Sequence, residues 1–327
     1  MKKTTRNIFV GAGVAALALA GISAAAYKAT ESLMKVALDR EVPKSTPKSK
    51  ARISGSKKLV EFAESAKEAA EKLMEKENEE IEITSPDGVK LVGHFFECEG
   101  AKRVIVAMHG WRSSWSSDFG AVSDFWQNSG CSVLYAEQRG QNKSGGDYMG
   151  FGMLERHDCL EWVKWVNERT GGALPIYLAG VSMGAATVLM ASGLEMPENV
   201  HGIMADCGFT SPHAIWKHVT EKNLHLSYGI IGIVANDICR KKINMGAKDY
   251  SATYALANSN IPVLFIHGTD DHFVPVEMTY ENYKACTAPK RLLIVPGADH
   301  AMSYYTAKEE YENKVLEFWR DFDEYEK

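Results

Sequence analysis

The spacing of apolar and polar residues changes several times along the chain, and each change predicts a new segment. The twenty residues from Ile8 to Tyr27 carry no charge. At a rise of about 1.5 Å per residue, a helix of this length would cross a hydrocarbon core of roughly 30 Å. Because a segment so uniformly apolar has no polar face to turn to water, we expect residues 1–28 to form a membrane anchor or a signal segment.

The segment that follows is strongly polar. Pro43 to Lys58 holds six basic residues, no acidic residue and several serines and prolines, a composition that cannot bury enough apolar surface to fold. We therefore expect a basic linker over residues 29–55, whose charges stay in water or touch anionic lipid headgroups. Apolar residues recur at helical spacing from Ser56 to Glu80, and this pattern predicts a helix that leads into the globular domain.

From Ile81 onward, short β-rich runs alternate with helix-length stretches, which is typical of a mainly parallel sheet with helices on both faces. The predicted fold class is therefore α/β, with a central sheet of about eight strands in a domain over residues 56–327. The first two strands are joined by a tight Pro-Asp-Gly turn and should pair antiparallel. The residues between Asp206 and Ser251 are too many for a short loop and predict a small helical cap over about 208–250. The strands are expected at Ile81–Thr84, Lys90–Glu97, Arg103–Met108, Ser132–Ala136, Pro175–Ala179, Gly202–Ala205, Val263–His267 and Arg291–Val295.

Composition and charge exclude some partners and cofactors. The chain carries 37 basic and 42 acidic side chains, a formal net charge of −5, so it has no global cationic field to attract a nucleic-acid backbone. Its six cysteines lie far apart, without a CxxC pair or a Cys/His cluster at metal-ligand spacing. We expect no nucleic-acid partner, no metal and no cofactor.

Charges beside the amino-terminal apolar segment predict its topology. Lys2, Lys3 and Arg6 precede it, an arrangement that holds the amino terminus in the cytoplasm and places the domain on the extracytoplasmic side of the cell membrane. The far flank is basic as well, so the charge rule alone is nearly balanced. Cleavage after Ala26 would secrete the domain, but the apolar run exceeds the roughly 7–15 residues of a signal-peptide core. We expect a retained single-pass anchor that contacts the lipid bilayer through residues 8–27.

A candidate nucleophile stands between a strand and a helix. The apolar run Ile176 to Ala179 leads directly into the sequence GVSMG centred on Ser182, and a helical stretch follows. In such a G-x-S-x-G turn the small residues let strand and helix approach closely, so that the hydroxyl projects above the sheet. The amino terminus of the helix behind it favours developing negative charge. The alternative is a glycine-rich helix start that Ser182 merely caps.

With this motif, the chain from about Ile81 to its carboxyl terminus resembles the α/β-hydrolase superfamily. Within it, the resemblance is to bacterial extracytoplasmic hydrolases related to the prolyl-oligopeptidase and dienelactone-hydrolase branches. It implies a catalytic triad in the chain order Ser, Asp, His. The segment HGTDDHFVP matches the family pattern H-G-x-x-D-x-x-V-P, which places the acid on Asp271. Asp270 in the same loop and Asp206 after the preceding strand remain alternatives for the acid.

The general base is expected on the loop after the last strand. His300 stands there, third in the order that the resemblance implies, with a ring expected to titrate near neutrality. The segment from His267 to His272 also holds four competent metal ligands. Four ligands on one tight loop rarely converge on one ion, and the H-G turn by itself explains His267. We therefore expect a proton relay here.

An oxyanion hole is implied by the same resemblance. Relatives place its first amide just after the strand that ends at Met108, so the backbone N–H groups of Trp111 and Met183 should hold the oxyanion. His109 is interpreted as part of the turn. The loop Glu137–Ser144 resembles the family's D-x-R-G-x-G-x-S loop with two departures, and its role is expected to be structural.

Aromatic residues in and beside the cap predict an apolar pocket for an acyl or aromatic group. Trp115, Phe209 and Trp216 are its candidate lining residues, although the same side chains could simply pack the cap onto the domain. Cys207 could face this pocket or lie packed as a buried thiol.

The expected reaction is acyl transfer to water through an acyl-enzyme on Ser182. Esters, thioesters, amides and peptides all fit these residues as substrates. An acyltransferase on the same triad is the enzymatic alternative. A catalytically inactive, membrane-tethered binding protein on a hydrolase scaffold is the alternative from another class.

Overall fold

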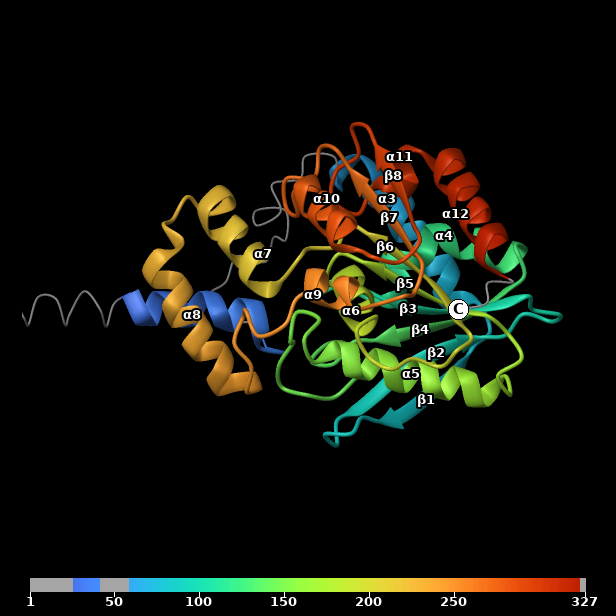
Figure 1. Ribbon diagram of the computed structural model, residues 1–327, viewed down its shortest axis with the longest axis horizontal. Coiled ribbons are helices and arrows are strands. Elements are labelled where there is room, and N and C mark those ends of the chain that lie inside the picture. Colours follow the sequence, from blue (N-terminus) through green and yellow to red (C-terminus); the bar gives the residue numbers. More distant parts are fainter. Residues whose placement is uncertain (1–25, 42–58, 324–327) are drawn as a thin grey trace, which may run out of the picture.

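The structure is a computed structural model that describes residues 26–41 and 59–323 (Figure 1). The predicted membrane segment lies outside the described residues, apart from its last two positions. Among the residues that are described, none of the helices combines the length and apolarity that a membrane crossing requires.

One mixed sheet of eight strands forms the centre of the molecule, in the order β1-β2-β4-β3-β5-β6-β7-β8. β1 pairs antiparallel with β2, and β2 with β4, whereas the remaining pairs are parallel. This topology confirms the predicted α/β class. The strands are β1 (Glu79–Thr84), β2 (Lys90–Phe96), β3 (Arg103–Met108), β4 (Cys131–Glu137), β5 (Ile176–Val181), β6 (Val200–Asp206), β7 (Val263–Gly268) and β8 (Lys290–Val295).

Helices cover both faces of the sheet because its inner strands are apolar on both sides. Along β3, Val104 and Val106 belong to one core and Ile105 and Ala107 to the other, and all four are fully buried, as expected for a strand between two helical layers. The first core holds α5 (Glu155–Arg169), α6 (Met183–Ala191), α9 (Ala252–Ala257) and α10 (Val276–Ala285); the second holds α3 (Leu59–Glu75), α4 (Trp115–Asn128) and α12 (Lys308–Phe322).

A helical cap stands between β6 and β7, at the end of the molecule shown on the left of Figure 1. It consists of α7 (Pro212–His218), a π-helical turn over Val219–Asn223 and α8 (Tyr228–Ile243). The cap therefore belongs to the same stretch of chain in which the sequence predicts one.

Residues 26–38 form a further helix, drawn in blue, which lies against α8 (Figure 1). The structure here differs from the linker expected to begin at residue 29. Thr30, Met34 and Leu38 repeat every fourth residue and are each at most 4% exposed, so the segment has one apolar face that packs and holds the helix in place. The basic stretch 42–58 lies outside the described residues.

Hydrogen bonds fasten the end of helix 26–38 to the rest of the domain. The amide of Met149 donates to the carbonyl of Leu38 at 2.7 Å. The guanidinium of Arg112 donates to the carbonyls of Val36 and Asp39, at 2.7 and 2.5 Å. These carbonyls belong to the last turn of the helix and to the residue after it, where carbonyls lack donors within the helix, and a cation there also complements the helix dipole. The helix is thus an integral wall of the domain.

Candidate active site

Ser182 occupies the sharp turn between β5 and α6, with φ 56° and ψ −115°, a conformation that L residues rarely adopt. Two glycines make this turn possible. A Cβ at Gly184 would lie 1.8 Å from the carbonyl oxygen of Met108, and one at Gly180 would lie 2.3 Å from the carbonyl oxygen of Gly184. The close crossing of strand and helix therefore requires glycine at both positions, which is the physical reason for the G-x-S-x-G spacing.

The structure brings Ser182, His300 and Asp271 together from three separate loops. Nε2 of His300 lies 2.9 Å from Oγ of Ser182, and Nδ1 of His300 lies 2.7 Å from Oδ2 of Asp271. Each residue follows a strand of the parallel part of the sheet, β5, β7 or β8. Because the carboxyl ends of parallel strands meet at one edge, residues far apart in sequence converge there.

Asp271 is held by a set of donors on the β7–α10 loop. Its Oδ1 accepts hydrogen bonds from the amides of Phe273 and Val274, at 2.9 and 2.8 Å, and its Oδ2 lies 3.1 Å from Nε2 of His267. Burial by itself raises the pKa of this carboxyl, but the charge of His300 and the hydrogen bond from His267 hold it well below its usual range. Asp271 is therefore ionised and fixed in direction.

His267 is a supporting residue that the sequence interpretation assigned to turn structure alone. It is fully buried, and its Nδ1 lies 2.7 Å from the hydroxyl of Thr279. With that hydroxyl donating to Nδ1, Nε2 carries the proton and shares it between the carbonyl of Val274, at 2.8 Å, and Oδ2 of Asp271. The sequence feature that could have indicated this role is the spacing in HGTDD, where the histidine stands four residues before the acid and the loop can turn one side chain onto the other.

The environment of His300 suits a general base. Burial would lower the pKa of its imidazole, but the ionised Asp271 raises it well above the ordinary value. Nδ1–H donates to the carboxylate, so that Nε2 presents its lone pair to Ser182. The edge of the Phe273 ring packs on the imidazole, with ring centroids 5.0 Å apart, and restricts its orientation.

Cys207 lies packed beside this relay. It is 1% exposed, its thiol lies against the imidazole of His300, and burial raises the pKa of the thiol to about 11, so it stays protonated. Cys207, Asp271 and His300 place candidate ligand atoms within 4.8 Å of one another. Both ring nitrogens of His300 are already engaged by Ser182 and Asp271, which favours a proton relay over a metal centre at this cluster.

The loop after β3 lies beside the nucleophile, as an oxyanion hole requires. A Cβ on Gly110 would be 3.4 Å from the Cβ of Ser182, and the amide of the next residue, Trp111, is one of the two expected donors. The other, Met183, is the first residue of α6, where amides have no acceptor within the helix. Asp118 on α4 anchors this loop by accepting the Gly110 amide at 2.6 Å, a support that the sequence interpretation did not identify.

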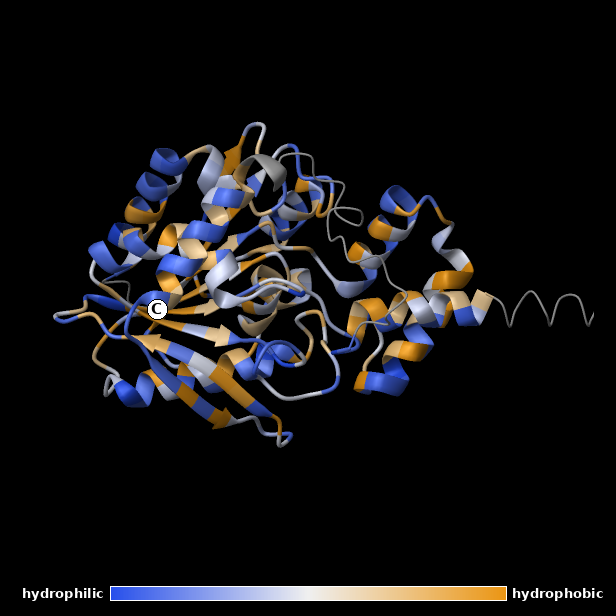
Figure 2. Cartoon of the chain, turned by 180° about the vertical axis from the view of Figure 1, so that it is seen from behind, coloured by the Kyte–Doolittle hydropathy of each residue, from blue (hydrophilic) through white to orange (hydrophobic). Residues whose placement is uncertain are grey.

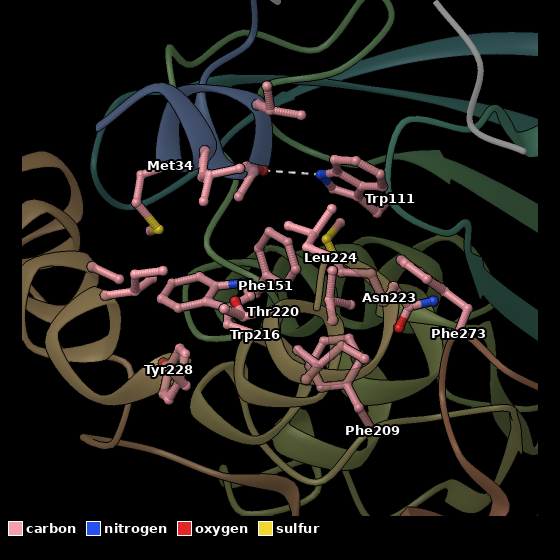
Figure 3. Close-up of a pocket in the computed structure, with 18 of the residues that line it drawn as sticks. Met34, Trp111, Phe151, Phe209, Trp216, Thr220, Asn223, Leu224, Tyr228 and Phe273 are labelled. Carbon is pink, nitrogen blue, oxygen red and sulfur yellow. Dashed lines mark hydrogen bonds between the residues drawn. The ribbon is translucent and has the colours of Figure 1, made fainter. Parts of the chain in front are cut away.

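A cavity of about 430 Å³ opens onto Ser182 beneath the cap. The expected pocket residues Phe209 and Trp216 line it, together with Trp111, Phe151 and Phe273 (Figure 3). None of the described residues in its wall is acidic, basic or a histidine. The cavity is thus suited to an apolar group, because a charged group would lose its hydration there without a partner.

Trp115, also expected in the pocket, lies elsewhere. It begins α4, which belongs to the second core on the other face of the sheet. Its ring stacks on the imidazole of His94 with centroids 4.4 Å apart. Trp115 is 7% exposed, so its role is to pack α4 against β2.

Helix 26–38 forms one wall of the cavity, which the sequence interpretation did not anticipate. The indole N–H of Trp111 donates to the carbonyl of Ala37 at 2.9 Å, the dashed line in Figure 3. This bond joins the helix directly to the loop that carries the expected oxyanion amide. The helix contributes Thr30, Leu33, Met34, Val36 and Ala37 to the lining.

Comparisons with known proteins identify the family of the chain. The model of the prolyl oligopeptidase family matches residues 117–323. The uncharacterized protein YqkD of Bacillus subtilis is 29% identical over 193 residues, which cover 58% of this chain but less than two thirds of YqkD, namely 62%.

Two solved structures share the fold. The Pyrococcus furiosus esterase Pf2001 has a TM-score of 0.61 at 23% identity, over 77% of this chain and 94% of the esterase. The Pyrococcus horikoshii acylaminoacyl peptidase has a TM-score of 0.58 at 18% identity, over 77% of this chain and 42% of the peptidase. These likenesses show an α/β-hydrolase fold.

Proposed function

The chain belongs to the prolyl oligopeptidase family, and from this premise we propose that it is a serine hydrolase that cleaves esters, thioesters or amides of apolar acids through an acyl-enzyme on Ser182. One observation carries the proposal: Nε2 of His300 lies 2.9 Å from Oγ of Ser182 at the opening of an uncharged cavity. A hydroxyl and an imidazole at this separation can exchange a proton directly.

The proposed reaction has two halves. In the first, Nε2 of His300 takes the proton of Ser182 as Oγ attacks the substrate carbonyl, and the imidazolium then gives that proton to the leaving alcohol, thiol or amine. In the second, His300 takes a proton from water, whose oxygen attacks the acyl-enzyme, and the same proton returns to Oγ as the acid leaves. Asp271 keeps the imidazole in the required tautomer and stabilises its charged form.

The backbone amides of Trp111 and Met183 are the proposed donors to the oxyanion of both tetrahedral intermediates. A donor of this kind typically contributes about 3 kcal/mol to transition-state stabilisation. Asp118 is a positioning residue, because its hydrogen bond to the Gly110 amide holds the loop that carries the Trp111 amide.

The apolar cavity favours an acyl chain or an aromatic acyl group over a charged one. Each buried methylene contributes about 0.8 kcal/mol, which corresponds to roughly a fourfold gain in kcat/KM for every carbon that the cavity accepts. Because an amide substrate is cleaved by the same chemistry, the activity test should also compare the rates on esters with the rates on peptide anilides.

The test uses the full chain in detergent. A fluorophosphonate probe should label the wild type and leave Ser182→Ala unlabelled, and p-nitrophenyl esters from acetate to octanoate should show kcat/KM rising with chain length. Failure of the wild type to react with the probe would overturn the proposed chemistry. Equal rates for all chain lengths would overturn the assignment of the cavity.

For the location of the enzyme, we retain the expected single-pass anchor at residues 8–27, with the domain on the extracytoplasmic side of the cell membrane. Twenty uncharged residues after Lys2, Lys3 and Arg6 support it. Fractionation of intact cells, followed by protease added from outside, should find the chain in the membrane and degrade its domain. Recovery of the domain in the culture medium would point to cleavage after Ala26.

A further inference from the structure

The cap carries an unusual concentration of exposed apolar side chains. Leu226, Ile230 and Ile233 are 45%, 67% and 73% exposed, and Tyr27 on helix 26–38 is 36% exposed. The other large apolar side chains exposed among the described residues, Met74, Tyr254, Tyr280 and Leu316, lie on different elements. Single exposed residues of that kind are ordinary on a protein surface, whereas a gathered set marks a contact.

The first half of α8 is apolar on both of its sides. Tyr228, Ile231 and Ala235 face inward and line the cavity, while Ile230 and Ile233, three residues apart, share the outward side. From residue 223 to 236 the chain has no Asp, Glu, Lys or Arg. A helix that is apolar all round is normally covered on all sides, so something must cover the outward side of α8.

Helix 26–38 connects this surface to the predicted membrane segment. The ammonium of Lys241 on α8 lies 5.7 Å from the centroid of the Tyr27 ring, and Lys242 forms an ion pair with Asp39 at 2.5 Å. The helix therefore crosses α8 and is fastened to it. Figure 2 shows the hydrophobic stretches of α8 at this end of the molecule.

The length of the connection limits how far α8 can be from a bilayer. The described chain begins at residue 26, so it includes only the last two residues of the uncharged run from Ile8 to Tyr27. Helix 26–38 is thirteen residues long, or about 20 Å at 1.5 Å per residue. If the membrane-spanning segment ends at Tyr27, the outward side of α8 therefore lies no further from the lipid than about the length of helix 26–38. The six basic residues of Pro43 to Lys58 would add an attraction to anionic headgroups.

We propose that the apolar end of the cap, formed by Leu226, Ile230 and Ile233, rests in the surface of the lipid bilayer together with Tyr27 of helix 26–38, and that the substrate is an ester lipid of that membrane. To reach the cavity, the hydrocarbon chain has to pass around α8, over a distance of about one helix diameter, roughly 10 Å. Ser182 then cleaves the ester C–O bond; water supplies the hydroxyl of the released fatty acid and the proton of the released alcohol. The substrate part of this inference rests on the proposed hydrolase function, whereas the bilayer contact does not.

The activity test uses the full chain in vesicles of phosphatidylcholine and phosphatidylglycerol. The double variant Ile230→Glu/Ile233→Glu should lose at least about tenfold in hydrolysis of a fluorogenic diacylglycerol within the vesicle, because two carboxylates oppose entry into the interface. Its rate on water-soluble p-nitrophenyl butyrate should stay within about twofold of wild type, since both substituted residues lie outside the cavity lining. Leu316→Glu, which places one carboxylate at an exposed leucine of α12, is the control and should change neither rate. An unchanged rate on the vesicle substrate in the double variant overturns the proposal.

A second measurement needs no hydrolysis at all. Five of the six cysteines are buried, and Cys98 is partly exposed, so a Cys98→Ser background allows a spin label to be attached at Ile233→Cys or at Leu316→Cys. Oxygen, which concentrates in hydrocarbon, should accelerate the relaxation of the label at 233 more than that of the label at 316. A water-soluble nickel chelate should accelerate the relaxation of the label at 316 more than that of the label at 233. Equal nickel accessibility at both positions refutes the bilayer contact. Lipid contact at 233 in a chain that the fluorophosphonate fails to label would instead refute the hydrolase function and leave the contact standing.

Discussion

Helix 26–38 offers a quantitative test, because one buried side chain at its end can be removed without touching the catalytic groups. Leu38 is fully buried in the first core and is not part of the cavity lining. Truncation of a buried leucine to alanine costs about 2–5 kcal/mol through lost burial and the space left behind. In Leu38→Ala this free energy weakens the attachment of helix 26–38 to the rest of the domain.

The expected magnitude can be stated for both structure and activity. A loss of 2–5 kcal/mol raises the population of the detached helix by about 30-fold to several thousand-fold, and amide hydrogen exchange of residues 26–38 should accelerate by that factor. Suppose that helix 26–38 contacts about three methylenes of an acyl chain, at ~0.8 kcal/mol each. Complete detachment of the helix then lowers kcat/KM for an octanoate ester by about 60-fold. An acetate ester does not reach the wall and should be unaffected.

The assay pairs hydrogen exchange with the two esters. Leu38→Asp provides the limit of full detachment, because an unpartnered buried carboxylate costs several kcal/mol more than alanine. Leu316→Ala, at an exposed leucine, is the matched control and should change exchange and rates little. The reasoning is refuted if exchange shows the helix detached in Leu38→Asp while the ratio of octanoate to acetate rates remains that of wild type.

Three further outcomes follow from the site. Asp271→Asn should lower kcat by about four orders of magnitude, because the imidazole loses the acceptor that fixes its tautomer; a loss below tenfold in ester hydrolysis would assign the acid elsewhere. Ester hydrolysis should fall as pH drops through the pKa of His300, since the protonated ring cannot take the hydroxyl proton. Asp271 raises this pKa, so the midpoint should lie above about 6.5, and a rate that is flat from about pH 5 to 8 contradicts the relay. Gly184→Ala should prevent stable folding in thermal melts, because its Cβ would lie 1.8 Å from the oxygen of Met108. Gly100→Ala, with nothing within 4 Å of the added Cβ, should cost only about 1 kcal/mol from its positive φ, and equal melting of the two variants would contradict the steric reasoning.

Local chemistry along the chain was sufficient for the fold class and for the choice of candidate residues. Apolar runs of strand length alternating with helices determine a mainly parallel sheet, because no other layer arrangement covers strands that are apolar on both sides. Ser182, Asp271 and His300 each come directly after such a strand. Since parallel strands end at one edge, their order in the chain already implied that they lie near one another.

Which side chains meet across the site depended on packing that no local pattern encodes. Trp115 and Trp216 are both aromatic residues on helices, yet one packs on the second core and the other lines the cavity, because the face that a helix covers is decided by its crossover connection. His267 and Asp118 became supports for the site only through loop geometry that turns them onto Asp271 and Gly110.

Helix 26–38 shows most clearly the difference between what the local sequence pattern specifies and what tertiary packing decides. Its apolar face repeats every fourth residue, but a single short helix is marginal in water and gains its stability from what it packs against. That partner, α8 with the loop after β3, lies more than seventy residues further along the chain. The residues alone therefore specified the chemistry at the strand ends, while the shape of the cavity around it arose from contacts between distant segments, whose free energy exists only once the whole domain is assembled.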